Sequence, residues 1–449
     1  MDITDLLPAY DRPVPRYTSY PTAPHFSPAI TAATYVTWLR ELGPQPVSLY
    51  LHVPFCARLC WFCGCHTTAT TGAAPVEAYA ETLLAEIDLL TAAIGRRLPV
   101  AHLHWGGGTP TALGDPAMRA VMDRLRAGFD VRDDAEIAVE LDPRTAGAAV
   151  LDTLAVIGCT RASLGVQDFD PDVQRAVNRI QSFDTTQACA TGLRARGIGS
   201  LNLDLIYGLP HQTEASVRRT AEQALALAPD RIAVFGYAHV PWMKKHQALL
   251  PQKALPDTRA RWHQRAAIEA VLLARGWHAI GLDHYARPGD ALAIAARQHQ
   301  VRRNFQGYTT DGATTLLGLG ASAIGSLPQG YVQNATAIPD YRDAVRAGTL
   351  PIARGVELTG EDRLRREVIE QLMCHGAVDL DATAARHHRP PDSLLAASDA
   401  LDDMAQDGLI KWDGRHIAVV PAARPLIRTI AAAFDAYLRP SPARHARAV

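Results

Sequence analysis

The stretch "VSLYLHVPFCARLCWFCGCH" (47–66) joins a run typical of a β-strand to a loop that holds four cysteines and a histidine. The chain of 449 residues has seven cysteines, and the other three stand alone at positions 159, 189 and 374. Isolated cysteines usually pack as small hydrophobic side chains, whereas clustered cysteines form disulfides, metal sites or redox pairs. The loop at 56–66 is therefore the first candidate for chemistry.

Charge and composition exclude several classes of protein. A net charge of −1 gives no general attraction to nucleic acid or to an anionic membrane surface. The N-terminus "MDITDLLPAYDRP" (1–13) has no basic segment before an apolar run, and no stretch reaches the roughly 18 apolar residues of a membrane helix. We expect a cytoplasmic protein with no membrane or nucleic-acid partner. Disulfides are rare in that compartment, so the clustered cysteines are expected to be ligands or catalysts.

Apolar strands alternate with amphipathic helices between residues 47 and 240. The first two helices are expected at 76–94, behind Pro75, and at 117–129, with Asp115 as N-cap and Pro116 in the first helical position. Such alternation predicts parallel strands joined by right-handed crossovers. Strands are expected at 47–54, 100–105, 136–141, 161–166, 201–208 and 231–240.

Polar residues follow the end of each expected strand. They are the cysteine loop, "GGGTPT" (106–111), Glu140, Gln167, Asp204, and Tyr237 with His239. A (β/α) barrel places its active site at the carboxyl ends of its strands, whereas a doubly wound sheet concentrates its site at one switch point. The sequence therefore predicts an α/β fold built on a partial (β/α)6 TIM-like barrel.

The sequence changes character after about residue 350. A charged helix is expected within 358–380 with Thr359 as its cap and Asp362 three residues on, and a hairpin within 408–420 that turns at Asp413 and Gly414. This pattern predicts a small, mainly helical, winged-helix-like domain, although the neutral charge argues against DNA binding. We expect three parts: an N-terminal arm or lid (1–35), the barrel and its extension (36–350), and the C-terminal helical domain (351–449).

The cysteine spacing leaves more than one metal site open. Cys56, Cys60 and Cys63 form C-x3-C-x2-C, and a structural zinc ion would need a fourth ligand from Cys65 or His66. A redox pair of Cys60 and Cys63 is weaker, because that motif normally opens a helix in a much shorter chain. Three thiolates on a four-iron cluster would leave one iron free for a substrate or cofactor.

This spacing, with the aromatic Phe62 before the last cysteine, resembles the radical S-adenosylmethionine (SAM) enzymes. The resemblance implies a [4Fe-4S] cluster held by Cys56, Cys60 and Cys63, whose open iron binds the amino and carboxylate groups of SAM. It also implies that an electron from the cluster cleaves SAM to a 5'-deoxyadenosyl radical.

Further segments resemble one family in this superfamily, the oxygen-independent coproporphyrinogen III oxidases. The resemblance implies decarboxylation of two propionates of coproporphyrinogen III to vinyl groups, which gives protoporphyrinogen IX for haem biosynthesis. Haem chaperones of the same superfamily are the alternative, but they typically lack Cys65 and the N-terminal "PRYTSYPT" stretch, and this chain has both. The segments are "PRYTSYPTAPHF" (15–26), "CWFCGCH" (60–66), "HWGGGTPT" (104–111), "GVQDF" (165–169), "VNRIQ" (177–181), "NLDLIYGLP" (202–210), "YAHVP" (237–241), "GLDHYARP" (281–288) and "RNFQGYTT" (303–310).

The same resemblance implies two SAM molecules per chain and a set of site residues. The first SAM would contact Tyr50, Gly107, Glu140 and Ile324. The second would contact Phe62, Gly108, Thr109, Gln167, Arg179, Asp204 and Ala238. The substrate, a tetracarboxylate, would meet Arg16, Tyr17, Tyr20, Arg302 and Arg303. The resemblance further implies a monomer that needs an unidentified electron donor and acceptor, and the chain departs from the family pattern at Trp61 and Gly236, where tyrosine and asparagine are expected.

Overall fold

Six parallel strands lie side by side in the order in which the chain makes them. The computed structural model describes residues 3–438 and 447–448. Neighbouring strands pair in parallel without any reversal of order, as in a barrel wall and unlike a doubly wound sheet. The predicted six-unit partial barrel is confirmed. Its strands are β1 (Val47–Val53), β4 (Pro99–Gly107), β5 (Asp130–Leu141), β6 (Arg161–Gln167), β7 (Ser200–Tyr207) and β8 (Arg231–Gly236).

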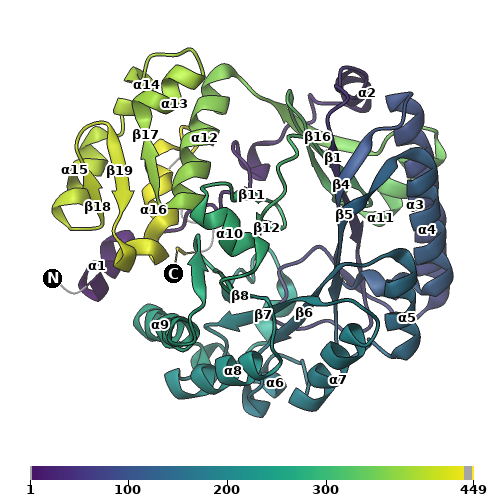
Figure 1. Ribbon diagram of the computed structural model, residues 1–449, viewed down its shortest axis with the longest axis horizontal. Coiled ribbons are helices and arrows are strands. Elements are labelled where there is room, and N and C mark those ends of the chain that lie inside the picture. The colour runs from purple at the N-terminus through teal and green to yellow at the C-terminus, as the bar shows by residue number, and fades with distance from the viewer. Residues whose placement is uncertain (1–2, 439–446, 449) are drawn as a thin grey trace.

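Helices cover the outer side of these strands (Figure 1). In α3, Leu83, Ile87 and Leu90 recur at helical spacing and are at most 1% exposed, so this face is buried against the sheet. None of the described helices is both long and apolar enough to cross a membrane. The outer helices are α3 (Ala73–Ile94), α4 (Asp115–Gly128), α5 (Ala148–Ile157), α6 (Pro171–Ala176), α7 (Phe183–Arg194), α8 (Glu214–Ala226) and α9 (Thr258–Ala274).

Two predicted helix starts are wrong by a few residues. Helix α3 begins at Ala73, so Pro75 lies inside its first turn, where the missing N–H is harmless. Helix α4 is capped by Gly114 rather than Asp115. The Asp115 carboxylate instead accepts hydrogen bonds from Thr153 (2.6 Å) and Arg119 (2.7 Å), so it links two neighbouring helices.

Further strands extend the sheet to twelve without closing it. Beyond β8 lies β10 (His284–Ala286), which is antiparallel to β8. Next to it lies β9 (His278–Ile280), which is antiparallel to β10. Beyond β1 lie β13 (Leu316–Leu319), which is parallel to β1, and then β14 (Ile324–Ser326), β15 (Gly330–Asn334) and β16 (Ile352–Glu357). The sheet therefore continues past the boundary expected at residue 350. Helices α10 (Ala291–Arg297) and α11 (Ile338–Arg346) and the hairpin β11 (Arg302–Asn304) and β12 (Gly307–Thr309) join these strands.

A separate lobe follows, as predicted (Figure 1). The Thr359 hydroxyl accepts from the N–H of Asp362 (3.1 Å), whose carboxylate accepts from the N–H of Thr359 (2.9 Å), so the expected capping box is present. The expected hairpin turns through Gly414, at φ +92°. The lobe consists of α12 (Gly360–His375), β17 (Ala377–Asp379), α13 (Leu380–Arg386), α14 (Asp392–Leu395), α15 (Ser398–Gln406), β18 (Ile410–Trp412), β19 (His416–Val419) and α16 (Ile427–Ala431). Residues 439–446 and 449 of the expected C-terminal domain lie outside the described residues.

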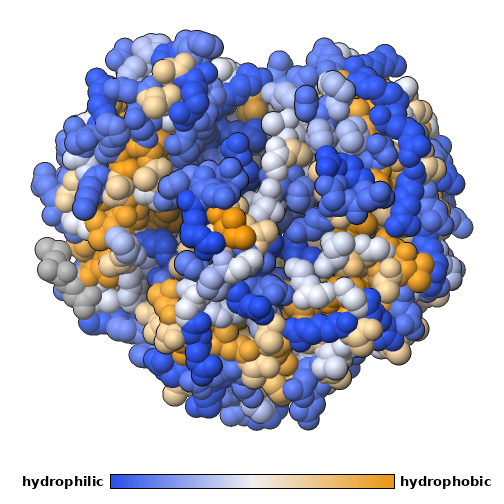
Figure 2. Space-filling view, in the orientation of Figure 1, coloured by the Kyte–Doolittle hydropathy of each residue, from blue (hydrophilic) through white to orange (hydrophobic). Residues whose placement is uncertain are grey.

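The N-terminal arm belongs to the hydrophobic core of this lobe. Helix α1 (Ile3–Tyr10) contributes Leu6, Leu7 and Tyr10 to one apolar cluster that it shares with residues of α12 and α16. Figure 2 shows a mostly hydrophilic surface on this face, hollowed between the lobe and the barrel. The arm continues from α1 towards α2 (Ala32–Arg40) between these two parts. Met1 and Asp2 lie outside the described residues.

Candidate active site

A cavity of about 680 Å³ lies inside the barrel. The cysteine loop and the strand ends line it at one end, and residues from the opposite ends of the strands, such as Ser48 and Arg161, line it deeper down. The cavity therefore runs along the barrel rather than across its mouth. Eight of the predicted site residues line it, together with Cys65: they are Arg16, Phe62, Cys63, Glu140, Gln167, Asp204, Ala238 and Arg303.

The cysteine loop is held by hydrogen bonds that join it to two other segments of the chain. The N–H of Trp61 donates to the Val177 carbonyl (3.0 Å), and the Asn178 amide donates to the Leu59 carbonyl (2.9 Å). On the other side, Lys244 Nζ donates to the Cys65 carbonyl (2.8 Å) and Gln247 donates to the Phe62 carbonyl (3.0 Å). Because carbonyls of the loop are fixed in this way, the directions of the cysteine side chains are fixed as well.

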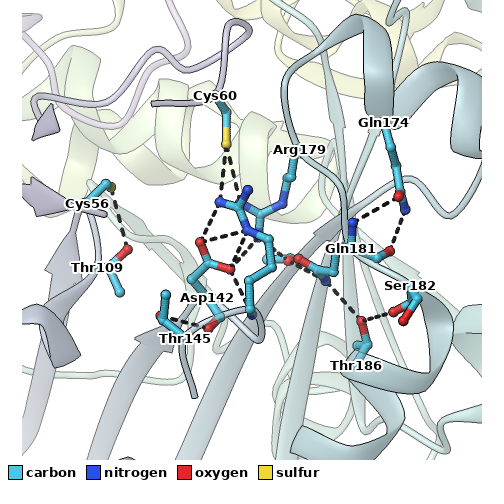
Figure 3. A network of polar contacts seen from close by, with 12 residues as sticks. Cys56, Cys60, Thr109, Asp142, Thr145, Gln174, Arg179, Gln181, Ser182 and Thr186 are labelled. Carbon is cyan, nitrogen blue, oxygen red and sulfur yellow. Dashed lines mark hydrogen bonds and ion pairs between the residues drawn. The ribbon is translucent and has the colours of Figure 1, made fainter. Parts of the chain in front are cut away.

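The thiols meet groups that favour the thiolate. Arg179 Nη1 lies 3.5 Å and Arg144 Nη2 3.6 Å from Cys60 Sγ, as Figure 3 shows for the labelled Arg179. A hydrogen bond from the Cys65 thiol lowers the pKa of Cys63 to about 7. Positive charge and donated hydrogen bonds both stabilise the ionised form that binds metals.

Cys56 has a different environment from Cys60. Its Sγ accepts from the Thr109 hydroxyl at 3.5 Å and lies 3.3 Å from Thr67 Oγ1. Burial raises the pKa of Cys56, although both hydroxyls act in the opposite direction.

The donor set fits an iron–sulfur cluster. Within the described residues, no three His, Cys, Asp or Glu side chains meet closely enough to hold one metal ion. In a four-iron cluster each thiolate binds a different iron, so three thiols can serve without converging on one point. Thiolates are also the ligands that iron–sulfur clusters require. Cys56, Cys60 and Cys63 therefore fit such a cluster.

The glycine stretch after β4 packs directly against the backbone that carries the cysteines. A Cβ on Gly107, at φ +118°, would lie 2.7 Å from the Val53 carbonyl oxygen, and one on Gly108 would lie 2.6 Å from that of Phe55. Only glycine permits this approach. The N–H of Gly107 donates to the Glu140 carboxylate (3.2 Å), so the glycine stretch, the cysteine loop and Glu140 form one unit.

Asp204 lies on β7, and the oppositely charged Arg179 lies in the segment between α6 and α7. Asp204 accepts from Asn202 (2.9 Å) and Ser163 (3.1 Å), and burial raises its pKa to about 6. Arg179 donates to the Gly165 carbonyl (2.6 Å) and lies 3.4 Å from Asp142. Both side chains are held in place by polar partners, and the cavity gives Asp204 access to a ligand.

Four predicted residues lie elsewhere. The Tyr17 hydroxyl donates to Asp435 (3.0 Å) and the Tyr20 hydroxyl accepts from the N–H of Ala436 (3.0 Å), so both phenols point into the C-terminal lobe. Arg302 is 59% exposed and pairs with Glu370 at 3.6 Å. Ile324 packs beside an apolar cluster around Phe26, Tyr331 and Leu358 rather than in the cavity lining.

Tyr50 lies on β1 beside the cavity rather than in its lining. Its hydroxyl lies 3.0 Å from His52 Nδ1, and its ring stacks on that of His104. Burial raises the pKa of Tyr50 well above its ordinary value, so the hydroxyl stays protonated.

The sequence reasoning missed a polar interior. His102 and His104 on β4, Glu136 on β5 and Arg161 on β6 all face the cavity. Glu136 and Arg161 form an ion pair (2.5 Å) there. These residues alternate with buried apolar neighbours, so the period of two in "VAHLHW" was a signal that they face inwards. No comparable signal marked Lys244 and Gln247 as partners of the cysteine loop.

Fold and site together define the class of protein. Residues 50–224 match the model of the radical SAM superfamily, and residues 358–426 match the model of the HemN C-terminal domain. A six-unit barrel with a C-x3-C-x2-C loop after its first strand is therefore a radical SAM barrel.

Individual relatives identify the family. The chain is 52% identical to the oxygen-independent coproporphyrinogen III oxidase of Bradyrhizobium diazoefficiens, over 99% of each chain. It is 45% identical to the enzyme of that name from Paracoccus denitrificans, over 95% of each. The solved structure of coproporphyrinogen III oxidase from Escherichia coli matches 94% of this chain and 98% of its own, with a TM-score of 0.90 and 39% identity. The chain belongs to the oxygen-independent coproporphyrinogen III oxidase family.

Proposed function

We propose that this chain converts coproporphyrinogen III to protoporphyrinogen IX by oxidative decarboxylation of two propionate side chains, without oxygen. One observation carries the proposal beyond family membership. A single cavity joins the cysteine loop to carboxylates that suit SAM and to arginines that suit a tetracarboxylate substrate. A chaperone that only held haem would not need the radical chemistry and the substrate subsites in one enclosure.

Cys56, Cys60 and Cys63 would hold the [4Fe-4S] cluster. When bound, the cluster supplies the electron that cleaves SAM to the 5'-deoxyadenosyl radical, which takes hydrogen from the propionate β-carbon before carbon dioxide leaves. Cys65 remains without iron, and its thiol hydrogen bonds to Cys63. The predicted contacts of this first SAM are Tyr50, Gly107, Glu140 and Ile324; of these, Glu140 lines the cavity and fixes Gly107.

A second SAM is proposed beside the first. Arg179 has the planar guanidinium that binds a carboxylate through two parallel hydrogen bonds, and Asp204 has a carboxylate that suits a ribose hydroxyl. The hydrogen bonds of both residues support this role, because they fix the side chains before a ligand arrives. The remaining proposed contacts are Phe62, Gly108, Thr109, Gln167 and Ala238.

The arm (1–35) is proposed as a lid. A primary alkyl radical must be kept from water and from other hydrogen donors, and the arm lies between the barrel and the C-terminal lobe. Arg16 on the arm and Arg303 on the β11–β12 hairpin face the cavity and are the proposed substrate contacts. The tyrosines of the arm hold it to the lobe instead.

Other properties follow from the same proposal. The reaction needs an electron donor for the cluster and an acceptor for the electron left on each decarboxylated side chain; neither is identified by its chemistry here. We further propose a cytoplasmic monomer that does not bind nucleic acid. All seven cysteines are free thiols in the structure.

Turnover separates this enzyme from a haem chaperone. Reconstituted protein with dithionite, SAM and cell extract as electron acceptor is expected to convert coproporphyrinogen III to protoporphyrinogen IX, detected by chromatography under strict anaerobiosis. The contrary result is a fully iron-loaded preparation that binds haem tightly but forms no vinyl product. That result would favour the chaperone.

A further inference from the structure

A smaller cavity of about 340 Å³ opens beside the main one. Both cavities are lined by Arg16, Asp283 and the segment 236–238, so they adjoin there. We call the smaller cavity the side chamber. Neither Glu140 nor any cysteine lines it, so it lies away from the cysteine loop. Its walls come from the barrel, the arm and the C-terminal lobe.

Three guanidinium groups at the side chamber and its border bond to main-chain carbonyls, whereas another arginine of the lining, Arg447, pairs with Asp11 (3.5 Å). Arg16 donates to the Gly236 carbonyl (3.2 Å), Arg261 to the Tyr237 carbonyl (2.9 Å) and Arg303 to the Arg16 carbonyl (3.2 Å). In the part of the chain that the structure describes, these three guanidiniums hydrogen bond to main-chain carbonyls and pair with no carboxylate. Arg16 is exposed and Arg261 and Arg303 are half-buried, whereas buried arginines such as Arg231, which pairs with Asp290 (2.8 Å), do have such a partner.

Some of these donors have no partner at all. Arg261 Nε and Arg303 Nη1 are buried without a hydrogen bond. Arg303 is also held flat over the Tyr308 ring, 4.4 Å from its centroid, which fixes the direction of its free donor. Buried donors without partners are rare in folded proteins and call for a ligand or an ordered water.

The positive charges also act on one another. Burial, followed by the charge of Arg16, lowers the pKa of Arg428 to about 9. Arg16 is exposed at the border of the two cavities, and desolvation by the surrounding protein lowers its pKa, with the charge of Arg303 acting in the same direction. Asp283 offsets part of this charge, but it already holds His284 Nδ1 at 2.8 Å. An anionic ligand would remove the remaining imbalance.

The C-terminal lobe completes the side chamber. Arg428 Nε donates to the Pro15 carbonyl (3.0 Å), and its guanidinium also bonds to the Val14 carbonyl, so the lobe fixes the backbone just before Arg16. On the barrel side, a Cβ on Gly236 would lie 2.8 Å from the Tyr207 hydroxyl. Gly236 therefore packs directly against Tyr207, and a side chain at this position, such as the asparagine expected in this family, would have to displace the Tyr207 hydroxyl.

We propose that the side chamber and its border with the main cavity bind the substrate carboxylates that are not decarboxylated, through Arg16 and Arg261 in the side chamber and Arg303 on the main-cavity side. This inference rests on the proposed function. Coproporphyrinogen III carries four carboxylates and the product keeps two, so those two need cationic partners that lie away from the radical. The location of the side chamber, its charge and its unpartnered donors meet this need.

Porphyrin binding tests the proposal without turnover. The probes are coproporphyrin III, with four carboxylates, and protoporphyrin IX, with the two retained ones, titrated anaerobically into the iron-loaded full chain. Arg261→Gln and Arg303→Gln are each expected to lower the affinity for both probes about ten-fold or more. Each variant removes a charged hydrogen-bond partner of the probe carboxylates. Arg302→Gln is the matched control, since Arg302 is adjacent in sequence but outside the cavities; we expect a change of less than about two-fold.

Arg16→Gln gives a second, independent variant on the arm, and melting temperature and iron content show whether each variant folds. Unchanged affinity in folded Arg303→Gln and Arg16→Gln would overturn the proposal. So would a loss confined to coproporphyrin III, because the arginines would then hold the reacting carboxylates. Wild-type protein that binds both probes through these arginines but forms no vinyl product would contradict the proposed function and leave the side chamber supported.

Discussion

The two sides of the cavity are built in different ways. The cysteine side comes from short segments that each follow a strand, such as the loop after β1 and the glycines after β4. The arginine side is assembled from distant parts of the chain: Tyr17 and Asp435, which hold the arm to the lobe, are 418 residues apart. The difference teaches that radical chemistry is encoded in local motifs, whereas recognition of the substrate depends on tertiary contacts between the arm, the barrel and the lobe.

The strongest test of the cysteine side is to remove its ligands. Alanine at Cys56, Cys60 or Cys63 is expected to abolish iron binding, whereas Cys65→Ser should keep it, because three thiolates suffice when the fourth iron is open. Iron content and visible absorbance of anaerobically purified variants measure this. Equal loss of iron in Cys65→Ser would mean that the three-ligand assignment is wrong.

The next test separates the second SAM from the first. Arg179→Ala and Asp204→Ala are expected to cleave SAM when reduced but to lose substrate conversion, by roughly a hundredfold or more if each loses a charged interaction in a buried site. Equilibrium dialysis should find more than one SAM per wild-type chain. Arg175→Ala is the control, since that side chain is 63% exposed on the same segment. A stoichiometry of one SAM, with both variants active, would contradict the second site.

A smaller effect concerns the rigidity of the cysteine side. Glu86 on α3, 1% exposed, accepts from Gly320 (2.7 Å), Asn334 (2.6 Å) and Tyr341 (2.7 Å), and so ties α3 to the strands beyond β1. Burial raises its pKa from 4.5 to about 7 although these donors lower it. Because the folded pKa is raised, the folded state holds the proton more tightly than the unfolded chain does. Its contribution to stability is complete below about pH 4.5 and is lost as the pH rises through 7.

The expected size of this loss is up to about 3 kcal/mol. The free energy of unfolding, measured with urea, should therefore decline between pH 5 and 8 in the wild type. The decline should be flatter in Glu86→Gln, whatever the absolute stability of the variant. Glu81→Gln, at an exposed position of the same helix, is the control and should keep the wild-type slope. The same slope in all three proteins would show that Glu86 is ionised throughout.

The smallest effect is expected on the arginine side. Tyr17→Phe removes one hydrogen bond to Asp435 and keeps the ring packing. The free energy that holds the arm on the C-terminal lobe should therefore fall by about 1 kcal/mol. Faster proteolysis within residues 1–35 measures this loosening. Asp435→Asn keeps an acceptor and should resemble wild type. If Tyr17→Phe is cleaved no faster, the arm is held by its apolar contacts alone.

The barrel could be predicted because parallel strands bury both faces and appear as apolar runs: Leu49 and Leu51 of β1 are at most 1% exposed. Strand ends were less predictable. β8 ends at Gly236 rather than Val240. The sequence also singled out Glu140 and Asp204, which line the cavity, because they follow apolar residues of the predicted strands. The assignment of the cluster ligands stays a prediction.

The partners of the arm could not be predicted from the sequence. Nothing near Tyr17 or Arg302 shows that one meets a carboxylate in the C-terminal lobe and the other pairs with Glu370 outside the cavity. Arg261 is equally inconspicuous, because an arginine on an amphipathic helix is usually a surface residue. These assignments depend on how separate elements pack, which local patterns do not record.

The central claim is that a radical formed on the cysteine side takes hydrogen from a propionate of a substrate whose retained carboxylates are held on the arginine side. Coproporphyrinogen III deuterated at the β-carbons of its propionates tests this claim most directly, with 5'-deoxyadenosine analysed by mass spectrometry after anaerobic turnover. We predict one deuterium in 5'-deoxyadenosine for each vinyl group formed. Vinyl product accompanied by unlabelled 5'-deoxyadenosine would contradict the account.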